Sequence, residues 1–306
     1  MVKVALSRCA SYEEAELNRA LARALEPLGG LAAFVRAGQR VLLKPNLIAA
    51  HSAEQAATTH PGVVLAVAAE VLRLGAACHI GDSPAFGRAA QVARRCGLLE
   101  GARRLGVPVV ELKGNTLRGG ARLTASLADY DVLISLPKLK AHDQLLFTAA
   151  LKNTYGLVAG KAKAWRHLAA CSDTGRFCRM LLAVHQAAAP VLTIVDGVVA
   201  MEGRGPRHGR PRPLGLLAAG ADGAAIDAVL CRLLGVAPER VPLLAEAARL
   251  GVGETRFERI EVAGGRPEEF SPADPFRLPG ELTDISFSPL QVLRSTVRHL
   301  RLKLSG

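Results

Sequence analysis

The stretch that decides the fold is Val-Leu-Ile-Ser-Leu-Pro-Lys-Leu-Lys-Ala-His-Asp at residues 132–143. Its first five residues form an apolar run rich in branched side chains, which is typical of a buried strand, and Pro137 ends that strand. After the proline, Lys138, Lys140 and His142 occupy alternate positions, so in an extended chain their side chains share one face about 6.6 Å apart. Two ammonium groups and an imidazole on one face repel one another unless an anion lies between them. The stretch therefore predicts a buried strand that leads directly into a binding site.

Outward from this strand, the N-terminal half alternates between strand-like and helix-like segments. The strand-like segments span residues 40–43, 77–80 and 107–112, and the helix-like segments span 58–74 and 87–95. This alternation is typical of β-α-β units, in which a parallel sheet carries helices on both faces. We therefore predict an α/β fold with a mainly parallel sheet flanked by helices, either as one body or as two lobes divided near residues 120–160. Any cleft is expected at the carboxyl ends of the strands.

The second half continues this pattern and then changes character. Helices are predicted over residues 144–153, 165–170, 177–188, 222–235 and 241–250, and strands over 191–195 and 258–262. We assign residues 1–270 to one α/β domain and residues 271–306 to a turn-rich segment that ends in a basic helix over 291–304. A threonine of Thr58-Thr-His-Pro61 is the candidate N-cap of the first predicted helix, with Pro61 at its first turn.

The charge balance favours an anionic partner. The chain has 306 residues, a net charge of +12 and a sequence pI of about 9.9. Its 39 basic residues are spread along the sequence, with no long basic tract and no interleaved aromatic residues, whereas a nucleic-acid groove is expected to show both. Phosphorylated or carboxylated small molecules are therefore favoured over nucleic acid as partners.

The cysteines and the first residues indicate a cytoplasmic protein. None of the six cysteines forms a C-x-x-C pair, so the sequence predicts neither a zinc ribbon nor an iron–sulfur cluster. The first eight residues are typical of a strand rather than of a secretory signal. No stretch is apolar for long enough to span a membrane. We therefore expect reduced thiols and a cytoplasmic location.

Polar residues end four of the predicted strands, next to Gly or Pro. Because the carboxyl ends of parallel strands meet at one edge of a sheet, these side chains are expected to line a single cleft. Lys152 and Asn153 could fold back over the same anion, and His60 precedes a proline at a helix start, where anions bind readily. The predicted strand-end residues are Lys44, Asn46, Asp82, Ser83, Lys138, Lys140, His142, Asp196 and Glu202.

We predict separate roles within this cleft. The residues expected to bind the ligand are Lys44, Asn46, His60, Ser83, Lys138, Lys152, Asn153 and Arg204. His142 is the candidate general acid or base, because its unperturbed pKa lies near neutrality. Lys140 is the candidate catalytic lysine, since neighbouring ammonium groups depress the pKa of an amine and make it a base or an imine former. Asp82 is the candidate carboxylate for proton transfer, while Asp196 and Glu202 could hold Mg²⁺, which prefers oxygen ligands.

Each candidate also has a purely structural interpretation. Lys44 fits a solvated strand end, and Asp82 fits a residue that caps the following turn. Asp196, which precedes a glycine, fits a turn in the same way. Lys152 near the end of a helix would interact favourably with the helix dipole, and His60 fits a buried neutral histidine.

A second candidate for anion recognition is the Gly/Pro/Arg loop at residues 203–213. Arginine forks such as that of Arg204 recognise phosphate or carboxylate with paired hydrogen bonds, and glycine permits close approach of the backbone. A solvated flexible loop would have the same composition, so both interpretations stay open. The loop does not match a dinucleotide-binding fingerprint, and the chain contains no Walker A sequence.

A set of short motifs resembles a known family. The motifs are Val41-Leu-Leu-Lys-Pro-Asn46, Thr58-Thr-His-Pro61, Ile80-Gly-Asp-Ser-Pro84, Pro137-Lys-Leu-Lys-Ala-His142, Leu151-Lys-Asn-Thr-Tyr-Gly156, Ile194-Val-Asp-Gly197 and Met201-Glu-Gly-Arg-Gly-Pro206. Their order resembles the bacterial and archaeal family known as domain of unknown function 362, over roughly residues 41–250. Many relatives carry a ferredoxin-like module with two 4Fe–4S clusters, whose cysteine motif this chain lacks. The resemblance therefore implies a separate redox protein as a partner, and the overall plan is also loosely similar to the lactate-racemase family.

Taken together, these patterns predict a protein that binds an anionic small molecule or cofactor in a cleft lined by Lys, His and Asp, as an enzyme. The alternative is a non-catalytic accessory or carrier protein that works beside a redox partner. A further alternative concerns residues 291–304, where basic and apolar residues interleave without an acid. That pattern is typical of contact with an anionic membrane surface, but a terminal helix packed on the body or on a partner subunit fits it as well.

Overall fold

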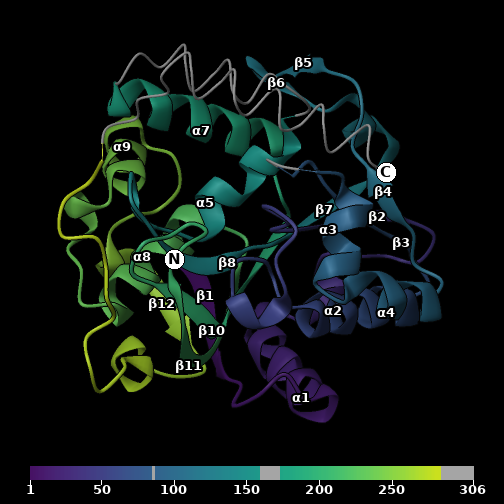
Figure 1. Cartoon of the computed structure of the whole chain (residues 1–306), viewed down its shortest axis with the longest axis horizontal. Coiled ribbons are helices and arrows are strands. Elements are labelled where there is room, and N and C mark those ends of the chain that lie inside the picture. Colours follow the sequence, from purple (N-terminus) through teal and green to yellow (C-terminus); the bar gives the residue numbers. More distant parts are fainter. Residues whose placement is uncertain (85–86, 159–172, 284–306) are drawn as a thin grey trace.

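The computed structural model describes residues 1–84, 87–158 and 173–283, which form one large sheet with helices on both faces (Figure 1). The helices are α1 (Glu14–Leu25), α2 (Pro61–Arg73), α3 (Ala89–Arg95), α4 (Leu98–Arg104), α5 (Ala150–Asn153), α7 (Thr174–Ala188), α8 (Gly223–Leu233) and α9 (Pro242–Leu250). The strands of the large sheet are β1 (Val2–Arg8), β2 (Arg40–Pro45), β3 (Ala77–Asp82), β4 (Val109–Glu111), β7 (Val132–Leu136), β8 (Lys138–His142), β9 (Leu146–Thr148), β10 (Leu192–Glu202), β11 (Arg210–Gly220) and β12 (Ile260–Ala263). A separate hairpin consists of β5 (Thr116–Arg118) and β6 (Ala121–Leu123).

The large sheet is mainly parallel, so the predicted α/β fold is confirmed. Its strands lie in the order β12-β1-β11-β10-β7-β2-β3-β4, with β8 paired to β10 and β9 paired to β8. Strands β11 and β9 run antiparallel to their neighbours, and the remaining pairings are parallel. The parallel strands therefore end at one common edge, which we call the carboxyl edge.

Two hydrophobic cores lie on the two faces of the sheet. On β2, Val41 and Leu43 pack into the core that contains residues of α1 and α2. Leu42, between them, packs into the other core with residues of α7 and α8. Successive side chains of a strand point to opposite faces, so a strand covered on both sides is apolar throughout. This explains the continuous apolar run of β7, where Leu133 and Ile134 likewise enter different cores.

The helix predicted over residues 144–153 is wrong in its first half. Residues Leu146–Thr148 form β9, which pairs with β8 so that Thr148 lies opposite Lys140. Only Ala150–Asn153 are helical, as α5. The free edge of β8 offers backbone hydrogen bonds to this segment, and such tertiary pairing overrides local helix propensity.

The loop predicted over residues 203–213 is shorter than expected. Strand β10 extends to Glu202 and β11 begins at Arg210, so only the turn between them is irregular. Residues 210–213 join the sheet because β10 presents a long unpaired edge to them.

Other predicted elements agree with the structure or lie outside the described residues. Asp222, the first residue of the helix predicted over 222–235, caps α8 by accepting hydrogen bonds from Ala224 N and Ala225 N. The described part of the turn-rich segment, residues 271–283, contains no helix or strand. The helices predicted at 165–170 and 291–304 fall outside the described residues. Among the helices that are described, none combines the length and apolarity needed to cross a membrane.

Candidate functional site

The candidate site begins where the buried strand ends. Immediately after Pro137 the chain resumes as β8, which pairs with β10. This strand is extended, as predicted, and its side chains alternate, so that the charged ones lie on one face and the apolar ones on the other. Leu139 and Ala141 pack into a hydrophobic core, whereas Lys138 and Lys140 share the opposite face.

Four lysines meet at the carboxyl edge, and we call them the lysine cluster: Lys44 of β2, Lys138 and Lys140 of β8, and Lys152 of α5. The first three are no more than 2% exposed, and Lys152 is half-buried. Lysine is almost never buried this completely unless its ammonium group is paired. The partners of each ammonium group therefore decide what the site can do.

Lys44 is paired with Asp82, at the end of the neighbouring strand. Its Nζ lies 3.0 Å from Asp82 Oδ1 and also donates to Pro45 O at 2.7 Å and Asn153 Oδ1 at 3.2 Å. Asp82 accepts further hydrogen bonds from Leu47 N and Ser83 N, both at 2.8 Å. Burial lowers the pKa of Lys44, and the charge of Asp82 opposes that shift. Asp82 is thus the counter-ion of Lys44, and its two oxygens are already occupied.

Lys138 is paired with Asp196 in a second buried group. Its Nζ donates to Asp196 Oδ2 and to Tyr12 Oη, both at 2.8 Å. The Tyr12 hydroxyl donates to Asp196 Oδ1 at 2.9 Å and accepts from Val199 N at 3.0 Å. Burial, followed by the charge of Asp196, raises the pKa of Tyr12. Asp196 is therefore a buried counter-ion held by several donors.

His60 joins the same group as a neutral ring. Its backbone N–H donates to Asp196 Oδ2 at 2.8 Å, and its ring stacks on Tyr12 with 3.5 Å between the ring centroids. Its Nδ1 accepts from Gly62 N, so His60, and not a threonine as predicted, is the N-cap of α2. Because a backbone N–H can only donate, the ring proton lies on Nε2. Burial lowers the pKa of His60 to about 4, which favours the neutral-histidine interpretation.

Lys140 differs from its neighbours because its partners are neutral. Its Nζ donates to Asn46 Oδ1 at 2.9 Å and to Ala57 O at 2.8 Å. No carboxylate of the described chain forms an ion pair with it. Burial lowers its pKa well below the usual value, and the charges of Lys152, Lys138 and Lys44 lower it further. Lys140 is thus a buried amine that its surroundings drive toward the neutral form.

Helix α5 carries Lys152 and Asn153 to the cluster. Asn153 Nδ2 donates to Lys44 O at 3.0 Å and to Ser135 Oγ at 2.9 Å, which fixes the helix to the ends of β2 and β7. Lys152 makes no hydrogen bond or ion pair within the described ranges. Burial, followed by the charge of Lys44, lowers its pKa to about 8. Lys152 is therefore the accessible cation of the cluster.

Asp227 of α8 holds the first turn of α5, a role that sequence reasoning missed. Its carboxylate accepts from Ala150 N at 2.8 Å and from Leu151 N at 3.2 Å. Burial raises its pKa to about 7. In the sequence, this aspartate looks like one polar position of an amphipathic helix. Only the packing of α8 against α5 reveals its function.

His142, the predicted general acid or base, ends β8 two residues after Lys140. It is 4% exposed, and its Nδ1 accepts from Gln144 N at 3.2 Å. That hydrogen bond places the proton of a neutral ring on Nε2. His142 lies about 6.6 Å along the strand from Lys140, on the same side.

Asp196 and Glu202, the candidate Mg²⁺ ligands, are each held by a different set of partners. Asp196 accepts from Lys138, Tyr12 and the backbone N–H of His60. Glu202 instead accepts from Arg277 N at 3.1 Å. The described residues contain no group of three or more His, Cys, Asp or Glu side chains arranged to hold a metal.

Ser83 and Arg204 are two further predicted ligand-binding residues. Ser83 contributes its backbone N–H to Asp82. Arg204 is exposed in the turn between β10 and β11, and the next residue, Gly205, accepts from Asp143 N at 3.3 Å, which places this turn beside the end of β8. By contrast, Tyr12 was missed by sequence reasoning and lies at the centre of the Lys138 group. No motif marked it, because it precedes α1 in a loop far from the other site residues in sequence.

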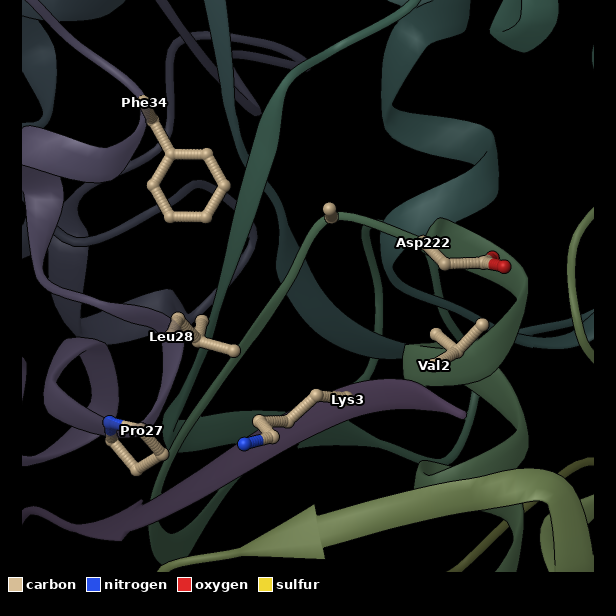
Figure 2. A pocket seen from close by; sticks show the side chains of 7 residues that line it. Val2, Lys3, Pro27, Leu28, Phe34 and Asp222 are labelled. Carbon is tan, nitrogen blue, oxygen red and sulfur yellow. The ribbon is translucent and has the colours of Figure 1, made fainter.

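A pocket of about 470 Å³ lies at the opposite edge of the sheet (Figure 2). It is lined by Val2, Lys3, Pro27, Leu28, Phe34, Ala221 and Asp222. Its two charged residues already have partners: Lys3 pairs with Glu261 at 3.0 Å, and Asp222 caps α8. β1 begins here and the antiparallel β11 ends beside it, so the pocket is remote from the carboxyl edge. It is therefore a less suitable site for an anion than the lysine cluster.

Comparison with known proteins identifies relatives of the whole chain. A family model described as domain of unknown function (DUF362) matches residues 41–232. A thylakoid-associated protein of Synechocystis sp. is 43% identical over 310 residues, which cover 99% of this chain and 96% of that protein. The family match spans β2 to α8 and therefore includes all four lysines of the cluster.

Two solved structures share parts of the architecture. The lactate racemase apoprotein from Thermoanaerobacterium thermosaccharolyticum has a TM-score of 0.49 and 12% identity, covering 76% of this chain and 56% of that one. A protein from Thermotoga maritima, solved by a structural genomics consortium, has a TM-score of 0.37 and 14% identity, covering 68% of this chain and 54% of that one. This chain therefore spans little more than half the length of either structure. At these TM-scores and identities the likeness carries no argument about function.

Proposed function

The chain belongs to the family described as domain of unknown function DUF362, and from that premise we propose that it binds an anionic small molecule or cofactor at the lysine cluster. The ligand carries a phosphate or a carboxylate group. The proposal extends to catalysis, with His142 and Lys140 as the acid–base candidates. A carrier that binds the same ligand without turnover, beside a redox partner, is the alternative.

The observation that carries this proposal is an imbalance of charge. Lys44 and Lys138 each have one carboxylate, from Asp82 and Asp196. Lys152 has none within the described chain, and the charges around Lys140 already drive that amine toward its neutral form. An anion at Lys152 would supply the missing negative charge.

The electrostatic effect of such an anion is large enough to matter. Two unit charges 4 Å apart interact by about 4 kcal/mol at an effective dielectric constant of about 20. Lys152 is the natural first contact, because it is half-buried while the other three ammonium groups are enclosed. Behind it, the charge of Lys44 extends the positive field into the protein. The aspartates act as counter-ions that position these lysines and leave the ligand to Lys152 and Lys140.

The test is ligand-dependent stabilisation of wild-type protein and a Lys152→Met variant. Inorganic phosphate and a panel of phosphorylated and carboxylated metabolites are added during thermal unfolding. A ligand at about 100 times its Kd stabilises the folded state by about 2.7 kcal/mol, so the melting temperature of wild-type protein should rise measurably. The rise should be largely lost in Lys152→Met.

The matched control is Lys113→Met, which removes an exposed lysine that is not part of the cluster. It should respond to ligands as the wild type does. Equal stabilisation of wild type and Lys152→Met by every anion would refute the proposed site. Binding without turnover of any bound compound would favour the carrier alternative.

For the location of the protein, we propose the cytoplasm, with peripheral association at an anionic membrane surface. Two observations support the membrane association: the net charge of +12, and the name of the Synechocystis relative, which describes it as thylakoid-associated. A basic protein is attracted to the negative surface of a membrane without needing a spanning helix.

A further inference from the structure

The hydrogen bonds of Lys140 match those of a neutral amine. A neutral amine has two N–H bonds and one lone pair, whereas an ammonium group has three N–H bonds to satisfy. Lys140 Nζ has two acceptors in the described chain, Asn46 Oδ1 at 2.9 Å and Ala57 O at 2.8 Å. Both acceptors are neutral. The two N–H bonds are therefore used, and the lone pair remains.

The charged groups around Lys140 favour the same form. Lys44 faces it from β2, Lys138 from its own strand β8 and Lys152 from α5, and the only opposing charge among its main electrostatic neighbours is Asp82 of β3. That carboxylate is already paired with Lys44. A proton added to Lys140 would thus join three nearby ammonium groups inside a buried site, which is costly.

We propose that Lys140 forms an imine with the carbonyl group of an anionic aldehyde or ketone. This inference rests on the proposed function, because Lys152 holds the anionic end of the ligand while Lys140 reacts with its carbonyl end. A reactive amine beside a cation that binds the substrate is the arrangement that imine chemistry requires.

The reaction balances without any further reagent. The lone pair of Lys140 Nζ attacks the carbonyl carbon, a C–N bond forms, and the electrons of the C=O π bond move to oxygen. The oxygen is protonated to give a carbinolamine. The C–O bond then breaks and water leaves, carrying both hydrogens of the original amine. The product is an imine between Lys140 and the ligand.

The burial of Lys140 defines the ligand further. Lys140 is 2% exposed, whereas Asn46 and Lys152 beside it are half-buried. A ligand held at Lys152 must therefore bring its carbonyl to a buried amine whose partner Asn46 is itself half-buried. A small molecule whose carbonyl lies close to its phosphate or carboxylate fits this arrangement. A carbonyl in the middle of a bulky molecule does not.

The chain provides its own comparison residues. Lys44 and Lys138 are as buried as Lys140, but each is held by a carboxylate that stabilises the ammonium form. Lys152 is more accessible, but it has the less perturbed pKa, at about 8. Lys113 is exposed and has no such surroundings. Selective reaction at Lys140 would therefore show that its lowered pKa causes the reactivity, because neither exposure nor burial alone distinguishes Lys140 from the other lysines.

The experiment treats full-length protein with glyoxylate, the smallest aldehyde that carries a carboxylate, near pH 7, and traps any imine with sodium cyanoborohydride. Peptide mass spectrometry then gives the extent of modification at each lysine. Each unit by which a pKa is lowered leaves about ten times more neutral amine at a pH below that pKa. We expect Lys140 to be modified ahead of Lys113 and ahead of Lys152, by up to about tenfold over Lys152, because a pKa of about 8 leaves about a tenth of Lys152 neutral at pH 7.

Two variants and an unfolded sample serve as controls. Lys140→Met keeps the aliphatic chain and should abolish the early modification, while Lys113→Met should leave it unchanged. In urea all lysines should react alike, which verifies that every peptide is detected. Modification of Lys152 or of exposed lysines ahead of Lys140 in folded wild-type protein would overturn the inference, whether or not Lys140→Met folds.

Competition with inorganic phosphate separates this inference from the proposed function. Both stand if phosphate slows the modification of Lys140. If phosphate stabilises wild-type protein but not Lys152→Met and Lys140 is not selectively modified, the imine fails and the anion site stands. If Lys140 is selectively modified but phosphate neither slows the reaction nor stabilises the protein, the imine stands and the proposed anion site fails.

Discussion

Asp196 shows how much one buried carboxylate can organise. It is fully buried, and its two oxygens accept from Lys138 Nζ, Tyr12 Oη and the backbone N–H groups of His60 and Val198. Removing its charge would leave the Lys138 ammonium group buried without a counter-ion. Breaking a buried ion pair from one side is far more costly than breaking an exposed one.

Asp196→Asn should therefore lower the free energy of unfolding by about 3–5 kcal/mol, measured by urea denaturation at pH 7. The matched control is Glu261→Gln, which breaks the exposed pair with Lys3 and should cost less than about 1 kcal/mol. A loss for Asp196→Asn as small as that of the control would show that Lys138 does not depend on this carboxylate.

At the scale of single residues, the sequence located most of the cluster but not its pairing. The alternation of Lys138 and Lys140 and the strand ends at Lys44, Asp82 and Asp196 predicted which side chains meet. Which carboxylate neutralises which lysine depends on the order of the strands, which local sequence does not encode. For the same reason, Tyr12 and Asp227 went unnoticed: each acts on an element distant in the chain.

At the scale of elements, α5 is the part of the site most dependent on its surroundings. It has four residues, far fewer than an isolated helix needs for stability in water. Its first N–H groups donate to Asp227, and Asn153 near its end is bound to β2 and β7. The position of Lys152 thus depends on a carboxylate on another helix.

The raised pKa of Asp227 predicts a pH dependence of stability. Its pKa rises from 3.8 to about 7 on folding, so the folded state binds the proton more tightly than the unfolded state does. Its contribution to stability is full below about pH 4 and is lost as the pH rises through about 7. Asp227→Asn cannot titrate, and its Nδ2 cannot accept the hydrogen bond that Asp227 Oδ2 takes from Leu151 N. The variant should be less stable than wild type by about 1–3 kcal/mol at pH 5, and the difference should narrow toward pH 8.

Urea denaturation of both proteins at several pH values measures this difference. The free energy of unfolding of the variant is subtracted from that of the wild type at each pH. This cancels the opposite pH dependence expected from His60 and His185, whose pKa values burial lowers to about 4. A stability difference between wild type and Asp227→Asn that widens toward pH 8 would contradict the raised pKa of Asp227.

Element prediction succeeded where local pattern and tertiary context agreed. The apolar run of β7 and the capped helix α8 were expected from the sequence and are present. The segments that became β9 and the start of β11 were misjudged, because each becomes a strand by pairing with a neighbour. Such pairing cannot be seen in a window of the sequence.

At the scale of the whole molecule, net charge carries a prediction about membranes. A protein with a charge of +12 should co-float with vesicles that contain anionic lipid and not with purely zwitterionic vesicles. Binding should weaken as salt rises, since the screening length falls to about 3 Å at 1 M. Flotation of the full chain and of a chain ending at Thr283 tests whether the C-terminal residues are needed. Equal recovery with both kinds of vesicle, or no recovery with either, would contradict association with an anionic membrane surface.

The overall architecture was the most predictable level. Alternating strand-like and helix-like segments implied a mainly parallel sheet with two covered faces, and the structure has both. The strand order and the two antiparallel insertions were not predictable, because hydrogen bonds between distant segments determine them. The carboxyl edge could nevertheless be anticipated, since parallel strands must end together whatever their order.

Because side chains alternate between the two faces of β8, the number of residues between β7 and the lysines decides which face each lysine occupies. One residue inserted just after Pro137 would change no other residue of the segment. It would nevertheless turn Lys138 and Lys140 into the core now filled by Leu139 and Ala141. Two amines would then be driven into hydrocarbon, and two apolar groups would face the carboxylates. Between β7 and the amines, the chain can therefore tolerate a change of residue more easily than a change of length.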